Sequence, residues 1–157
     1  MDKIKEAQAK YRPPNQIKVL FVGESPPSNG KYFYFGCNSL LRQMWHALEE
    51  DQSTDTNFLT NFMKRGWYFD DLVQIPVKRS QLRKACREAR DDLTSRVRDY
   101  RPSIIVCLLR RIRDDVEAAA LMADSDACVY AVSFPPQQPR RYQEEMRLLR
   151  PRLERLP

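Results

Sequence analysis

One acidic residue, Glu24, shares a glycine-rich stretch at residues 23–36 with a run of four aromatic side chains. The stretch holds three of the four glycines of the chain and follows the apolar run at residues 17–22, which is typical of a buried strand ending in a loop. Open α/β sheets bind ligands in loops at the carboxyl ends of parallel strands. An aromatic face can stack on a flat ring, and a carboxylate can act as a general base beside it. We therefore expect the chemistry of this chain to lie in this stretch.

Two later segments carry polar residues that can complete such a site. Asp71 follows a short apolar run, with Asp70 as the alternative, and Arg140 and Arg141 follow a proline-rich segment at residues 134–139. Arginines at the start of a helix complement the charge of a phosphate. A carboxylate, a stacking aromatic ring and a basic helix start together suit a flat, polar ring that is attached to a phosphodiester chain.

Short apolar runs alternate with stretches of helical periodicity along the chain. This alternation predicts a three-layer α/β/α sandwich with a central, mostly parallel sheet of about four strands. The length of 157 residues, without repeats or a linker, predicts a single domain over residues 1–157. Strands are predicted at residues 17–22, 67–76, 103–109 and 128–133, and helices at 39–48, 56–64, 80–99, 111–122 and 140–155, after an N-terminal arm or short helix in residues 1–16.

The formal net charge of +6 makes nucleic acid a plausible partner. The alternative is that the arginines solvate helix faces, and we expect the cluster of Arg110, Arg111 and Arg113 at the surface rather than in a site. No apolar run reaches the roughly 20 residues of a membrane span, and the N-terminus has no secretory segment. These features predict a cytoplasmic protein that has no contact with a membrane, and we expect a monomer.

The four cysteines are widely spaced and form no C-x-x-C pair, so we assign no metal site and no cofactor. Cys107 and Cys128 lie in apolar runs, and we expect both to be small buried hydrophobic residues.

Several motifs resemble those of one family of DNA-repair enzymes. Residues 22–27, Val-Gly-Glu-Ser-Pro-Pro, resemble the first motif of the uracil-DNA glycosylase superfamily, in which a strand ends in Gly, a polar or acidic residue and a proline. Residues 33–38, followed by the Trp-His-Ala-Leu of residues 45–48, are similar to the mismatch-specific and thymine-DNA glycosylase branch. Residues 71–76 are similar to its Asp/Asn-Leu/Ile-Val segment, and residues 101–108 to the superfamily's proline followed by a buried strand.

The resemblance implies a DNA glycosylase that flips a nucleotide into a pocket and hydrolyses the N-glycosidic bond of uracil or a related damaged base. Glu24 would orient water against the anomeric carbon and stabilise an oxocarbenium-like sugar. Phe33, or Phe35 if the loop alignment slips, would stack on the base, and Asp71 would read its Watson–Crick edge. An ionised Asp only accepts hydrogen bonds, whereas the family's Asn also donates them. The wider set that the resemblance implies adds Ser25 for base binding, and Pro26, Pro135, Pro136, Gln137, Arg140 and Arg141 for DNA binding.

The last motif departs from the family pattern. The family has His or Asn before Pro-Ser, which supplies a donor to the leaving base, whereas this chain has Phe134. Losing one such donor costs about 2.7–4 kcal/mol of barrier, and Gln137 or Gln138 is the alternative source of a donor. Three functions therefore remain open. One is an active DNA glycosylase, and the second is a catalytically inactive glycosylase-like protein that binds nucleic acid or a nucleotide. The third, ranked last, is a small-molecule or nucleotide-handling domain with no polymer partner.

Overall fold

The computed structural model of the chain describes residues 2–48 and 54–157. Within these residues four strands form one parallel sheet in the order β2-β1-β3-β4. The strands are β1 (Val19–Gly23), β2 (Trp67–Asp71), β3 (Ile104–Cys107) and β4 (Cys128–Ala131).

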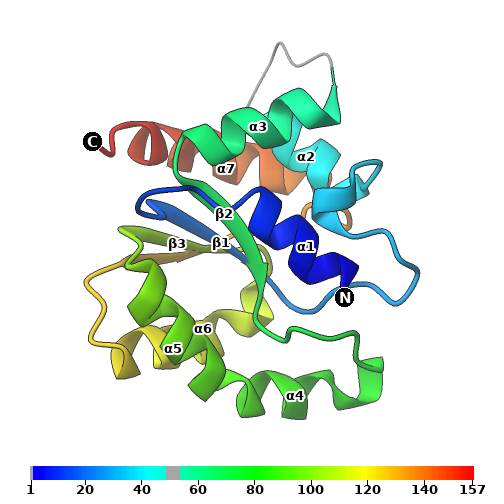
Figure 1. Ribbon diagram of the computed structural model, residues 1–157, viewed down its shortest axis with the longest axis vertical. Helices are drawn as coiled ribbons and strands as arrows, with labels where there is room; N and C mark the ends of the chain where they lie inside the picture. The colour runs from blue at the N-terminus through cyan, green and yellow to red at the C-terminus, as the bar shows by residue number, and fades with distance from the viewer. Residues whose placement is uncertain (1, 49–53) are drawn as a thin grey trace.

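Helices cover both faces of the sheet. Figure 1 shows α2, α3 and α7 on one face, α4, α5 and α6 on the other, and α1 beside β2. The three-layer α/β/α sandwich predicted from the sequence is therefore confirmed. The helices are α1 (Lys3–Lys10), α2 (Ser39–Leu48), α3 (Asp55–Lys64), α4 (Leu82–Glu88), α5 (Arg90–Tyr100), α6 (Arg113–Met122) and α7 (Pro139–Glu154), with short 3-10 turns at η1 (Phe33–Phe35), η2 (Arg79–Gln81) and η3 (Arg110–Ile112).

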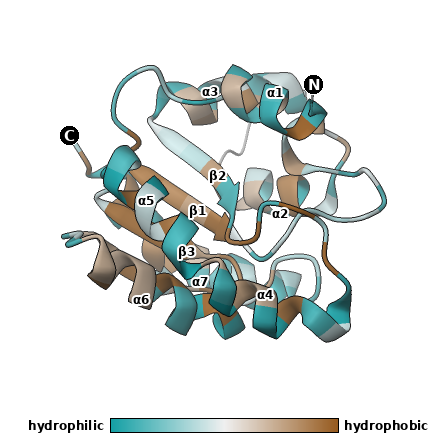
Figure 2. Ribbon diagram, turned by 60° about the horizontal axis from the view of Figure 1, so that its bottom comes forward, coloured by the Kyte–Doolittle hydropathy of each residue, from teal (hydrophilic) through white to brown (hydrophobic). Residues whose placement is uncertain are grey.

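The centre of the sheet is the most apolar part of the fold. Every residue of β1 is buried, and β1 pairs with β2 on one side and β3 on the other (Figure 2). Burial on both faces explains why β1 reads as a continuous apolar run rather than an alternating one. At the edge strand β4, Cys128 is exposed, so its predicted burial is wrong; β4 has a neighbour on only one side. The prediction for Cys107 on β3 is confirmed.

The boundaries differ most from the sequence predictions in two places. The strand predicted at residues 67–76 ends at Asp71, five residues before Pro76. The helix predicted at residues 80–99 is divided at Ala89, whose ψ of −4° departs from the helical value of about −42°. Asn38 caps α2, because its side chain accepts from the Leu41 N–H at 3.1 Å.

The strand order fixes where a ligand can bind. From β1 the chain moves to β2 on one side, and β3 then returns to the other side of β1. The connections leaving β1 and β3 therefore pass over opposite faces of the sheet and open a crevice at their carboxyl ends, which is the usual ligand site of open α/β sheets. The sequence placed Glu24 directly after β1, at this crevice.

Candidate active site

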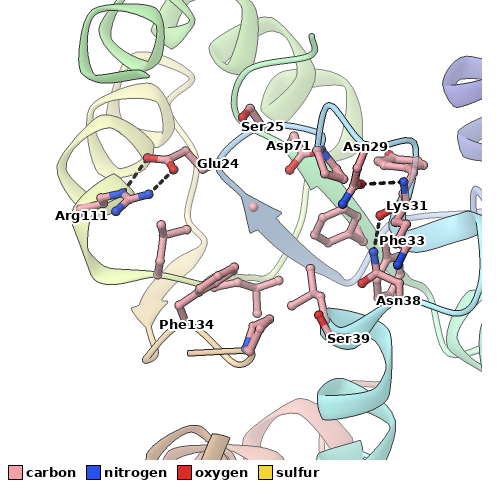
Figure 3. A pocket seen from close by; sticks show the side chains of 18 residues that line it. Glu24, Ser25, Asn29, Lys31, Phe33, Asn38, Ser39, Asp71, Arg111 and Phe134 are labelled. Carbon is pink, nitrogen blue, oxygen red and sulfur yellow. Dashed lines mark hydrogen bonds and ion pairs between the residues drawn. The ribbon is translucent and has the colours of Figure 1, made fainter. Parts of the chain in front are cut away.

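A pocket of about 250 Å³ lies at the carboxyl ends of β1 and β3. Pockets that bind drug-sized ligands measure about 300–1,000 Å³. This pocket is smaller and suits a ligand of the size of one heterocycle. Gly23 and Glu24 contribute from the end of β1, Leu108 and Leu109 follow β3, and Asp71 ends β2 (Figure 3). The crevice created by the strand order is therefore the one that holds the pocket.

Gly23 makes room for the carboxyl group of Asp71. The two residues face each other in the register of β1 and β2. A Cβ atom at position 23 would lie 2.5 Å from Oδ1 of Asp71 and 3.0 Å from Cζ of Phe69. Real Cβ atoms do not approach so closely, so the glycine is required for the carboxyl group to lie over the end of β1.

Asp70, the alternative that the sequence left open, belongs to the framework rather than to the pocket. Its side chain is 1% exposed and forms an ion pair with Arg96, with 2.7 Å between Nη1 and Oδ2. The Tyr100 hydroxyl donates to Oδ2 at 3.0 Å, and Gln74 Nε2 and the Asp71 N–H donate to Oδ1 at 2.8 and 2.9 Å. Asp70 is thus a buried charge whose partners bind β2 to α5.

Asp71 lines the pocket and is 3% exposed. Within residues 2–48 and 54–157, no group hydrogen-bonds to its carboxyl oxygens. Burial, followed by the charge of Asp70, raises the pKa of Asp71 well above its ordinary value, although Arg96 lowers it. The nearby Glu24 carboxylate raises it further. These shifts favour the protonated form relative to an exposed Asp, and a protonated carboxyl both donates and accepts a hydrogen bond, as an Asn amide does.

Phe33 is one of the aromatic residues that line the pocket, and Phe35 lies outside it. Phe33 is 1% exposed and packs on Phe69, with 4.5 Å between ring centroids. Phe35 is 45% exposed and meets the ring of Tyr32 edge-on at 5.4 Å. Of the two aromatics that the sequence left as alternatives for stacking, the structure brings Phe33 to the same pocket as Glu24 and Asp71.

Glu24 is held at the pocket mouth by Arg111. The guanidinium binds both carboxylate oxygens: Nε donates to Oε2 at 2.8 Å, and Nη2 donates to Oε1 (Figure 3). Glu24 is mostly buried, with 13% of its side chain exposed, whereas Arg111 is 59% exposed. The hydrogen bond to Glu24 raises the pKa of Arg111. A bidentate pair fixes the plane and position of the carboxylate better than a single contact would.

The proline-rich segment supplies part of the pocket. Phe134 and Pro136 line it, and the apolar ring of Phe134 can donate no hydrogen bond there. Gln137 and Arg141 line an adjoining hollow of about 260 Å³ that shares Leu109, Arg111 and Phe134 with the pocket.

The structure does not bring every predicted site residue into these hollows. Ser25 lines the pocket, as does the exposed Pro27, whereas Pro26 is buried and lines neither hollow. Pro135 is also buried, and Arg140 is exposed outside both.

Sequence reasoning missed or misplaced several residues of the pocket, among them Arg111 and Tyr32. Arg111 was expected at the surface, and although it is exposed, it pairs with Glu24 across a sequence separation of 87 residues. Tyr32 lines the pocket with its hydroxyl 3.0 Å from Gln8 Nε2, and burial raises the pKa of Tyr32, so the hydroxyl stays neutral. Its place within the aromatic run was the only signal in the sequence.

Two further observations concern metals and membranes. Among the described residues, no group of His, Cys, Asp and Glu side chains is arranged to hold a metal ion. No helix in the described ranges is long and apolar enough to cross a membrane.

A parallel sheet with helices on both faces, and a ligand pocket where its strand order reverses, define an open α/β protein. The sequence profile of the uracil DNA glycosylase superfamily matches residues 9–153. The chain therefore belongs to the uracil DNA glycosylase superfamily. A comparison with curated proteins found no match.

Proposed function

We propose that the protein is a monofunctional DNA glycosylase that hydrolyses the N-glycosidic bond of uracil or a related damaged base flipped out of DNA. The observation that carries this proposal is the single pocket lined by Glu24, Phe33 and Asp71. A carboxylate, a stacking ring and a hydrogen-bonding acid are the three groups that base recognition and excision need. The protein would act as a single-domain monomer in the cytoplasm, without a metal or a cofactor.

Phe33 and Asp71 would select the base. The ring of Phe33 stacks on the flipped base, which contributes about 1–3 kcal/mol. Uracil presents a carbonyl oxygen next to an N–H group, so a protonated Asp71 can donate to the first and accept from the second. The absence of any hydrogen bond to this carboxyl within the described residues supports the assignment, because a base would supply the missing partners.

Glu24 would act on the sugar. As the N-glycosidic bond breaks, positive charge develops on the anomeric carbon, and a carboxylate beside it stabilises that charge and orients the attacking water. Arg111 would hold the carboxylate in place through its two hydrogen bonds. General base catalysis of this kind contributes about 10²–10⁴-fold to the rate.

Excision of uracil from labelled oligonucleotides tests this function. The protein is incubated with single-stranded DNA and with U·G, U·A and T·G duplexes, and alkali-labile abasic sites are measured. We expect cleavage at uracil and a loss of about 10²–10⁴-fold in Glu24→Gln. The matched control is Glu117→Gln, which removes a surface carboxylate paired with Arg113. A folded protein that cleaves none of a panel of deaminated and oxidised bases contradicts the proposal.

The T·G and U·G duplexes address the branch of the superfamily. We propose, from residues 33–38 and 45–48, that the chain is nearest to the mismatch-specific and thymine-DNA glycosylase branch. This assignment predicts faster excision from mismatched duplexes than from U·A duplex.

The second candidate function is a catalytically inactive protein that binds nucleic acid or a nucleotide. The observation that favours it is Phe134, which presents an apolar ring to the pocket at the place where the family has a hydrogen-bond donor. This candidate predicts salt-dependent DNA binding without an abasic product. Phe134→His separates the two: a gain in excision indicates an active site that lacks only its donor, and no gain favours the binding protein.

A further inference from the structure

A second basic hollow adjoins the pocket. We call it the arginine groove; it measures about 410 Å³ and shares Glu24 and Arg111 with the pocket. η2 and α4 contribute Arg79, Arg83 and Cys86 to it. The arginine groove and the pocket are therefore neighbours, and the Glu24–Arg111 ion pair lies at their boundary.

The carboxylates of the arginine groove are already neutralised. Glu24 binds Arg111, and Asp115, which also lines the groove, binds Arg90 with 2.7 Å between Oδ1 and Nε. Arg79 and Arg83 are exposed, and neither forms an ion pair with any residue in 2–48 or 54–157. Two guanidinium groups thus face the hollow without a counter-charge from the described chain.

Arginines on the neighbouring helix α5 behave differently. Arg90 and Arg96 both bind carboxylates, Asp115 and Asp70, at 2.7 Å. The segment at residues 76–88, in contrast, carries five Lys or Arg residues and one acidic residue, Glu88. A charge excess concentrated beside the pocket is what an anionic ligand requires, whereas a merely solvated helix face would interleave the two signs.

We propose that the arginine groove binds the backbone phosphates of the DNA strand next to the nucleotide that enters the pocket. This inference rests on the proposed function, because a flipped nucleotide carries its flanking phosphates to the pocket rim. Arg79 and Arg83 present planar, forked donors that match phosphate oxygens. Arg111 stands at the boundary, so the strand passes over the Glu24–Arg111 pair.

The hollow lined by Gln137, Gln138 and Arg141 also adjoins the pocket, with which it shares Leu109, Arg111 and Phe134. Arg111 lines the arginine groove as well, so three adjoining hollows meet at this residue. Arg110 in this hollow is paired with Glu145, which leaves Arg141 as its unpaired guanidinium within the described residues. Cationic side chains in both adjoining hollows would give the strand two anchors next to the pocket.

The test measures binding of the full chain to undamaged single-stranded DNA. A fluorescein-labelled oligonucleotide of about 15 nucleotides, which covers the site size of a typical single-strand groove, is titrated by fluorescence anisotropy at several salt concentrations. The variant is Arg79→Ala/Arg83→Ala. The control, Lys84→Ala/Arg87→Ala, removes the same charge from exposed positions of α4 that do not line the groove. Thermal unfolding checks that both variants fold.

We expect the slope of log Kd against log salt to fall in magnitude by about 1.4 in Arg79→Ala/Arg83→Ala, because each phosphate contact on a single strand contributes about 0.7. Affinity at about 50 mM salt should fall on the order of tenfold. The control should keep the wild-type slope. An unchanged slope in the groove variant, an equal change in both variants, or no binding by the wild type overturns the inference.

A neutral phosphate identifies the contact directly. Methylphosphonate is placed at one phosphate at a time on either side of a uracil, and binding is measured with Glu24→Gln to prevent turnover. We expect that methylphosphonate at one flanking position weakens DNA binding by Glu24→Gln. The same methylphosphonate should not weaken DNA binding by the triple variant Glu24→Gln/Arg79→Ala/Arg83→Ala. Equal weakening in both proteins at every position assigns the phosphate to another surface. If the wild type excises uracil while both variants are weakened equally, the proposed function stands and only the phosphate-binding role of the arginine groove is contradicted.

Discussion

Asp70 and Asp71 are neighbours on β2, and both side chains are almost fully buried, yet Asp70 belongs to the framework of the fold and Asp71 to the pocket. Asp70 turns toward α5, where Arg96 and Tyr100 bind its carboxylate. Asp71 turns into the pocket, where no described group binds its carboxyl. Successive residues of a strand point to opposite faces of a sheet, so one residue step separates the framework from the site. A buried carboxyl with all its partners stabilises a fold, whereas one without partners marks a place for a ligand.

The largest expected effect is a difference in the free energy of unfolding between variants of Asp70 and Asp71. Asp70→Asn removes the buried charge partner of Arg96, whose side chain is 14% exposed and keeps only the exposed Asp92, and breaking a buried pair costs about 3–5 kcal/mol. Asp71→Asn removes no hydrogen bond formed by the described chain and replaces a buried ionisable carboxyl by a neutral amide, so it should not lower the free energy of unfolding. Urea unfolding of the two isosteric variants at neutral pH measures the difference. Equal losses would show that both carboxyls are structural.

The next effect concerns the space that Gly23 provides. In Gly23→Ala the new Cβ would lie 2.5 Å from Oδ1 of Asp71 and 3.0 Å from the Phe69 ring, and such overpacking costs about 1–3 kcal/mol. In an Asp71→Ala background the first contact disappears, so the same substitution should cost less. A double-mutant cycle in urea measures the coupling, which should be at least about 0.5 kcal/mol. Additive losses would mean that the Asp71 carboxyl does not lie over Gly23.

The different roles of Asp70 in the framework and Asp71 in the pocket were only partly predictable from the sequence. Apolar runs that end at Gly23 or begin after Pro102 identified the strands, since a buried parallel strand needs no alternation. The choice between Asp70 and Asp71 depends on the register of β2 against β1, which no local pattern encodes.

Two further features of the site, the different positions of Phe33 and Phe35 and the pairing of Arg111 with Glu24, also depend on the folded structure. Phe33 and Phe35 would share a face in a strand, whereas the 3-10 turn η1, with about three residues per turn, sends them in different directions. The pairing of Arg111 with Glu24 joins residues 87 positions apart, and only the fold brings them together. Local sequence therefore predicted the elements, and the site details required their packing.

A pH titration separates a neutral Asp71 from an ionised one. Burial and Asp70 raise its pKa in the folded chain above the unfolded value of about 3.9. The folded chain binds this proton more tightly, so the stability it contributes is complete below about pH 4 and is lost as pH rises through the folded pKa. Asp71→Asn lacks this loss, and its advantage over wild type should grow by up to about 1.4 kcal/mol per pH unit in that window.

Urea unfolding of both proteins between about pH 4 and pH 9 measures this advantage. Excision provides a second readout, because wild type should lose base recognition at alkaline pH while Asp71→Asn keeps it. Parallel stability curves for the two proteins would mean that Asp71 is ionised throughout.

The smallest effect on stability is expected at the ion pair that faces the pocket. Arg111 is 59% exposed, and ion pairs of exposed side chains contribute about 0–1 kcal/mol, so Arg111→Ala should barely change urea unfolding. Its excision rate should fall more, because Glu24 loses the guanidinium that fixes its position, and Arg111→Lys should recover only part of the rate since an ammonium lacks the planar fork. A stability loss above about 2 kcal/mol in Arg111→Ala would instead make this pair part of the framework, like that of Asp70 and Arg96.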